Sequence, residues 1–104
     1  MKATPTRHVE REHTSPTWAE DSKVLWALDD GTHVVSSSVR KTVGTFPVDE
    51  VMVFPADESI WITDWGELGS QYPAGDHAAA IRNAGYEPTG EIPAPETQRI
   101  EDEP

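Results

Sequence analysis

Four histidines, a run of three serines and several acidic pairs are the residues of this 104-residue chain whose types could carry out chemistry. His77 follows Asp76 at the predicted start of a helix, where an Asp–His pair could act as a general base. The sequence ties no nucleophile to that pair, so we interpret Asp76 as a helix cap and His77 as an exposed helix residue. His8 and His13 do not have the i, i+4 spacing of two zinc-binding histidines on a helix.

The serines and the acidic pairs also lack the sequence surroundings that catalysis requires. The serines of 36–38 show no strand–turn–helix motif that would expose a nucleophile, and they are typical of a serine-rich strand. Adjacent acids at 29–30, 49–50 and 57–58 fall in predicted turns, where carboxylates hydrogen-bond to nearby backbone. The absence of cysteine excludes thiolate catalysis, disulfides and cysteine-based zinc sites. We therefore predict no catalytic residue, no metal ligand and no cofactor, and we expect the protein not to be an enzyme.

Tryptophan gives the better lead to a function. Trp61 alternates with Ile60 and Ile62 in a predicted strand, so it should lie on the opposite face from the two isoleucines. Trp65 follows near the end of that strand. Aromatic side chains among charged residues are typical of protein interfaces, but cover by the N-terminal arm or by the first hairpin would account for Trp61 equally well. The candidate protein interface consists of Trp61, Trp65, Asp57, Glu58, Asp64 and Glu67.

The sequence around these residues predicts short strands joined by turns. Val24–Leu28 and His33–Val39 lie on either side of an Asp-Asp-Gly-Thr turn, which indicates a hairpin. The continuously apolar run Val51–Phe54 indicates a strand that is covered on both faces. Pro55 ends that strand, and Ile60–Asp64 is predicted to return as the next one.

One helix is predicted over His77–Ala84. Asp76 precedes an alanine-rich run and has the side chain of a good N-cap. Gly85 stands where a residue with positive φ ends a helix, and in that register Ile81 and Tyr86 should touch, as in a Schellman cap. So short a helix must be held by packing on the sheet.

These elements predict a single α+β domain over residues 22–87, with a small antiparallel sheet of three to five strands and one short C-terminal helix. Residues 40–49 contain a glycine and a proline, which predicts a connection with at most a short edge strand. Residues 1–21 are polar and are expected to form a disordered arm. Residues 88–104 are rich in proline and glutamate, and we expect a disordered acidic tail.

Three motifs follow one another along the chain: Phe54-Pro55-Ala56-Asp57, Trp65-Gly66-Glu67-Leu68, and the helix from Asp76-His77 to Gly85-Tyr86. This order resembles small proteins of actinobacteria and of their tailed phages, with which no activity is associated. The resemblance covers about a third of the chain, and it implies a phage-encoded protein in the cytoplasm of a host cell. The segment Val39–Glu50 departs from the pattern because it is longer and more charged than its counterpart.

The net charge of −11 narrows the possible partners. Lysine and arginine supply affinity for phosphate backbones, so we expect no direct binding to nucleic acid. The chain has no apolar run long enough to span a membrane. We expect a cytoplasmic interaction protein that modulates a host protein or a defence system. The sequence leaves open whether its partner is basic and whether the chain also self-associates. The alternatives are a DNA mimic that inhibits a nucleic-acid-binding protein, and a small enzyme or ligand-binding domain without a recognisable motif.

Overall fold

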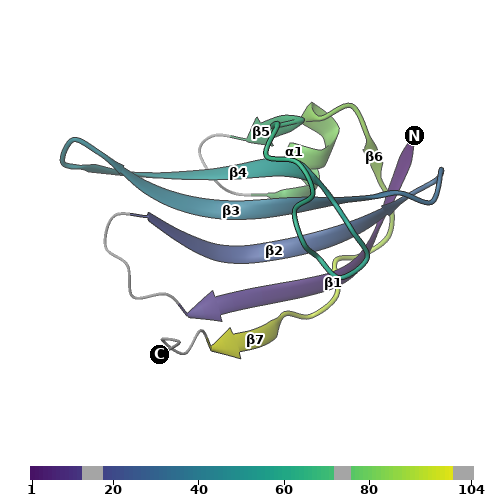
Figure 1. Cartoon of the computed structure of the whole chain (residues 1–104), viewed down its shortest axis with the longest axis horizontal. Coiled ribbons are helices and arrows are strands. Elements are labelled where there is room, and N and C mark those ends of the chain that lie inside the picture. The colour runs from purple at the N-terminus through teal and green to yellow at the C-terminus, as the bar shows by residue number, and fades with distance from the viewer. Residues whose placement is uncertain (13–17, 72–75, 100–104) are drawn as a thin grey trace.

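Four strands of 11 residues each form the body of the molecule. The computed structural model describes residues 1–12, 18–71 and 76–99 (Figure 1). The long strands are β1 (Lys2–Glu12), β2 (Trp18–Leu28), β3 (His33–Val43) and β4 (Phe46–Ala56). They are followed by β5 (Gly69–Gln71), α1 (His77–Asn83), β6 (Glu87–Pro88) and β7 (Glu96–Arg99).

The seven strands of the described residues belong to one mixed sheet. The order is β5-β4-β3-β2-β1-β6, and β7 also pairs with β1. Neighbours from β5 to β1 are antiparallel, whereas β6 and β7 run parallel to β1. The α+β class is confirmed in this coarse sense. The prediction of three to five strands, all antiparallel, is wrong, because both predicted tails contribute strands to the sheet.

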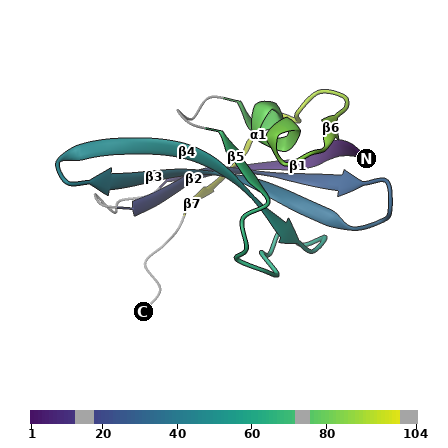
Figure 2. The same cartoon turned by 90° about the horizontal axis from the view of Figure 1, so that it is seen from above.

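The sheet buries apolar side chains on both faces. Figure 2 shows α1 on one face and the link from β4 to β5 on the other. Alternation along the strands sends Val24 and Trp26 toward the helix, where they join a cluster that includes Ile81. On the other face the cross-strand partners Leu25, Val35 and Phe54 are buried. The complete helix-side cluster consists of Ala3, Val24, Trp26, Leu28, Val34, Val51, Val53, Ala80 and Ile81.

Helix α1 has the predicted caps and ends one residue earlier than predicted. The Asp76 carboxylate accepts a hydrogen bond from the Ala78 N–H at 2.9 Å. At the other end, Tyr86 N–H donates to the Ile81 carbonyl at 3.1 Å and Gly85 N–H to the Arg82 carbonyl at 3.0 Å. These are the two hydrogen bonds of a Schellman motif, and the φ of 94° at Gly85 permits them.

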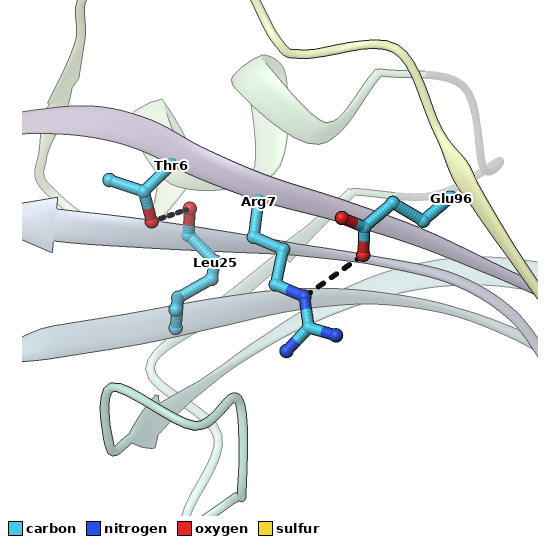
Figure 3. Close-up of polar contacts among 4 residues, drawn as sticks. All are labelled: Thr6, Arg7, Leu25 and Glu96. Carbon is cyan, nitrogen blue, oxygen red and sulfur yellow. Dashed lines mark hydrogen bonds and ion pairs between the residues drawn. The ribbon is translucent and has the colours of Figure 1, made fainter.

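The prediction of a disordered arm is wrong for residues 1–12 and 18–21. Lys2–Glu12 forms β1 between β2 and the C-terminal strands, and residues 18–21 are the start of β2. Only a few side chains of β1, such as Ala3 and Val9, are buried, so its composition resembles that of an unfolded segment. A register shift after Pro5 accommodates the proline. In that bulge the Thr6 hydroxyl donates to the Leu25 carbonyl at 3.3 Å (Figure 3).

The C-terminal segment is not a free tail over residues 88–99. Glu96–Arg99 pairs with the second half of β1, and Glu87–Pro88 with its start. Figure 3 shows Arg7 of β1 reaching Glu96, with Arg7 Nε and Glu96 Oε2 3.1 Å apart. The predicted disorder of residues 13–17 and 100–104 lies outside the described residues.

Residues 40–49 are strand rather than connection, apart from a tight turn at the tip of the β3–β4 hairpin. Gly44 makes that turn with a φ of 63°. Pro47 is tolerated because its backbone nitrogen points away from β3. The Val53 carbonyl accepts a hydrogen bond from Leu68 N–H on the outer edge of β4. Pro47 is six residues before Val53, and residues an even number of positions apart in a strand direct their backbone groups to the same edge. Pro47 therefore sits where no hydrogen bond to β3 is lost.

Gly69 determines how closely α1 approaches β5. A Cβ at this position would lie 2.6 Å from the Cα and 2.7 Å from the backbone nitrogen of Ala84. We predict that Gly69→Ala lowers the free energy of unfolding by about 1–3 kcal/mol, because the end of the helix must move away from the sheet. Gly66→Ala is the control, since its Cβ would meet only the Asp64 side chain, at 3.1 Å. Urea unfolding of both variants tests this, and equal losses would contradict the close approach.

Candidate functional site

The six residues of the predicted interface all lie in one segment, residues 57–68, which we call the β4–β5 connection. It crosses the sheet face opposite α1 (Figures 1 and 2). Trp61 is 73% and Trp65 68% exposed, and the four acids Asp57, Glu58, Asp64 and Glu67 are exposed as well. Whether these residues form an interface stays a prediction, but all six are exposed on this one segment.

Trp61 is exposed for a different reason from the one predicted. Ile60–Asp64 is not a strand; only Ile62 makes an isolated bridge, to Ala56. The chain turns back sharply instead, because Asp57 Oδ1 accepts from the N–H groups of Ser59 at 2.8 Å and Trp61 at 3.1 Å. Ile60 completes this turn with a φ of 68°, a conformation that a β-branched residue rarely adopts. Strand alternation therefore does not apply to Trp61.

Further contacts fix the rest of the β4–β5 connection to the sheet. Thr63 N–H donates to the Pro55 carbonyl at 2.9 Å, and Leu68 N–H to the Val53 carbonyl at 2.8 Å. The Trp65 ring lies edge-on to the buried Phe54 ring, with centroids 5.4 Å apart and planes at 65°. The two indoles are thus presented by an anchored backbone.

A second polar constellation lies on the helix face of the sheet, and sequence analysis missed it. His77 is the first residue of α1, and its ring points inward between two strands. Ser36 Oγ lies 2.6 Å from His77 Nδ1, and Ser22 Oγ lies 2.9 Å from His77 Nε2. The buried Trp26 donates its indole N–H to Ser36 Oγ at 2.9 Å. The prediction that His77 is exposed is therefore wrong, whereas the capping role of Asp76 is confirmed.

The inward positions of the strands contain a signal for this network. Ser22 and Ser36 lie on the helix side of the sheet, the same side as Val24, Trp26 and Val34. A hydroxyl buried there needs a hydrogen-bond partner. That pattern predicts a polar contact on this face. It does not identify His77, whose position depends on how α1 packs.

Hydrogen-bond directions in this network favour a structural role. Ser36 Oγ accepts a hydrogen bond from the indole N–H of Trp26, and we therefore assign its own hydroxyl hydrogen to the contact with His77 Nδ1. The ring hydrogen then sits on Nε2 and is donated to Ser22. Activation of Ser22 as a nucleophile needs the reverse direction, with Ser22 donating to Nε2. Ser36 does donate to the ring, but its oxygen is also held by the indole N–H of the buried Trp26. The arrangement therefore holds the helix to the sheet better than it would activate Ser22.

The surroundings of His77 keep its ring neutral. Burial lowers the pKa of His77 from 6.5 to about 4, and the nearby His8 contributes to this lowering. The two imidazoles are in edge contact, with centroids 5.9 Å apart, and His8 Nδ1 lies 3.1 Å from the Pro93 carbonyl oxygen. Asp76 and Ser36 act in the opposite direction and are outweighed. A neutral ring is what the hydrogen bond from Ser36 to Nδ1 requires.

Two of the three acidic pairs lie in turns, as predicted, whereas the prediction is wrong for residues 49–50, which belong to strand β4. Asp29 accepts from the backbone N–H of Lys2, and hydrogen bonds from Thr32 lower the pKa of Asp30. Asp57 closes the turn described above. Within the described residues, no group of three or more histidines and acids is placed to hold a metal ion. No helix in that part of the chain has the length and apolar character needed to cross a bilayer.

Ser36 and its neighbour Ser37 form a matched pair for testing the network. Ser37 is also buried, but on the other face of β3, and its hydroxyl has no hydrogen-bond partner among the described residues. We predict that Ser36→Ala costs about 2 kcal/mol of stability, because it leaves Trp26 and His77 unpaired. Ser37→Ala should cost under about 0.5 kcal/mol or be stabilising. Urea unfolding measures both, and equal effects would contradict the network.

The neutral His77 also predicts a pH dependence of stability. The unfolded chain takes up a proton at this residue near pH 6.5, but the folded chain does so only near pH 4. The stabilisation is therefore complete above pH 6.5 and is lost progressively as the pH falls to 4, by about 3 kcal/mol in all. The wild type should lose more stability than His77→Gln between pH 7.5 and pH 4.5, about the window of this shift.

His33→Gln is the matched control for removing one histidine, since His33 lies outside the network. It should lose as much stability over this pH interval as the wild type does. An NMR titration of the His77 ring measures its pKa directly. Titration of the His77 ring near pH 6.5, or a pH dependence of stability that is unchanged in His77→Gln, would contradict the lowered pKa of His77.

Comparison of the chain with protein-family models, with curated protein sequences and with solved structures finds no match. The resemblance to proteins of actinobacteria and their phages therefore stays an expectation from the sequence.

Proposed function

We propose that this chain is a non-enzymatic interaction protein that binds a basic surface of another protein through the β4–β5 connection. The observation that carries the proposal is the exposure of Trp61 and Trp65 on an anchored segment. Tryptophan is strongly enriched among residues that dominate binding energy at interfaces. Because the backbone below the two indoles is already ordered, binding would lose little conformational entropy there.

The charge of the connection supports a basic partner. Residues 57–68 contain four acids and no lysine or arginine. A second copy of the chain is a poorer partner for this surface, because two such segments would repel each other. The overall charge of −11 steers association toward positively charged proteins in the same way.

An enzymatic role has less support from the described residues. The Ser22–His77–Ser36 set has the distances of a catalytic group, but Ser36 is held by the indole N–H of the buried Trp26, and the ring hydrogen assigned to Nε2 points at Ser22. If the resemblance to phage proteins holds, the partner is a host protein in the cytoplasm, and binding modulates that protein or a defence system. This setting belongs to the proposal.

A comparison of bait proteins tests the interface. Wild type and the double variant Trp61→Ala/Trp65→Ala are used to capture proteins from an actinobacterial lysate at two salt concentrations. Phe46→Ala is the matched control, because Phe46 is also 73% exposed but lies at the tip of the β3–β4 hairpin. We predict that wild type and Phe46→Ala retain the same protein and that the double variant loses it.

Each recovered protein is then measured for binding. Trp61→Ala should weaken its affinity by about 1 kcal/mol or more, roughly a fivefold loss. The midpoint of thermal unfolding should change little, since the indole is largely exposed. If the same proteins are recovered with the wild type and the double variant, and at both salt concentrations, the proposed interface is refuted.

A further inference from the structure

We infer that the partner segment bound by the β4–β5 connection presents arginine, with its guanidinium stacked on Trp61 or Trp65 and paired with a neighbouring carboxylate. This inference rests on the proposed function and names the chemistry that the surface selects. It concerns a protein segment, because phosphate-bearing partners would be repelled by the acids of the connection.

The exposed groups of the connection are of two kinds, and a cation satisfies both. The indole face carries partial negative charge and is the best aromatic partner of a cation. Acids adjoin the indoles along the chain: Asp64 precedes Trp65 directly, and Asp57 is hydrogen-bonded to the backbone of Trp61 at 3.1 Å. Apolar peptides would bury the indoles but would leave these carboxylates partly desolvated and unpaired.

The carboxylates are placed so that one oxygen of each remains for a partner. Asp57 uses Oδ1 for the N–H groups of Ser59 and Trp61, and Asp64 uses Oδ1 for Gly66 N–H at 2.8 Å. Within the described part of the chain, Oδ2 of either residue makes no contact of this kind. The side chains are thus fixed in orientation and still able to accept a hydrogen bond.

Arginine fits this combination better than lysine. Its guanidinium is planar, so it can stack on an indole while its N–H groups point sideways to a carboxylate. Lysine carries a compact, strongly hydrated charge that cannot do both from one position. Exposed cation–π contacts contribute about 0.5–1 kcal/mol each, so the preference for arginine should be about threefold.

Three synthetic peptides test the inference on the full-length protein. They alternate glycine with arginine, with lysine or with citrulline, the neutral analogue of arginine, and they are otherwise identical. The readout is the NMR signal of each indole N–H. Trp26 serves as an internal reference, because it is 1% exposed and its N–H is bound to Ser36. A proline-rich neutral peptide is added as a fourth probe.

We expect the arginine peptide to shift the Trp61 and Trp65 signals, to leave Trp26 unmoved and to bind about threefold more tightly than the lysine peptide. Citrulline should abolish binding. Trp61→Ala and Trp65→Ala should each weaken the arginine peptide, and Phe46→Ala should not.

Several results would overturn the inference. Equal binding of the arginine and lysine peptides that survives both tryptophan substitutions would show attraction to the overall negative charge alone. Binding of the citrulline or proline-rich peptide at the two indoles would overturn the arginine preference and leave the proposed function standing. No shift with any peptide also overturns the arginine preference, whereas the proposed function fails only if the bait comparison finds no protein that depends on the indoles.

Discussion

The sheet is buried on both faces at its centre, and this constraint determines where the other segments lie. Leu25, Val35 and Phe54 turn away from the helix and are nevertheless almost inaccessible to solvent. One short helix covers one side only, so the second side needs its own cover. The β4–β5 connection lies on that side, with Trp65 against Phe54. The two exposed indoles are therefore carried by a segment that the fold itself requires.

The helix side of the sheet is covered by polar contacts in addition to apolar packing. Helix α1 has seven residues, too few to be stable alone, and it contributes Ala80 and Ile81 to the core. His77 adds a directional contact through Ser22 and Ser36, which fixes the rotation of the helix on the sheet. Such a network specifies one arrangement only while every member is paired and the imidazole is neutral.

The parts of the fold that could be predicted from the sequence are those that depend on neighbouring residues. The caps of α1 and the turn around Gly31 follow from local backbone chemistry, and both occur as expected. Strand β1 could not be predicted, because it is polar and its partners include residues from the far end of the chain. Strand alternation leaves open whether Trp61 is exposed or covered, and its exposure results from the turn at Asp57 and the unusual φ of Ile60. The ring of His77 turns inward because of tertiary packing that no local pattern encodes.

The parallel pairing of β1 with the C-terminal strands has a consequence for folding. Arg7 and Glu96, which form the ion pair beside this contact, are 89 positions apart. Closing so long a loop costs conformational entropy before any stabilising contact forms, and non-local pairing of this kind therefore slows folding. During synthesis, the outer edge of β1 stays open until residues 87–99 have emerged from the ribosome. An open strand edge is a template for pairing with other chains, so the nascent protein is most prone to aggregate before its last strand arrives.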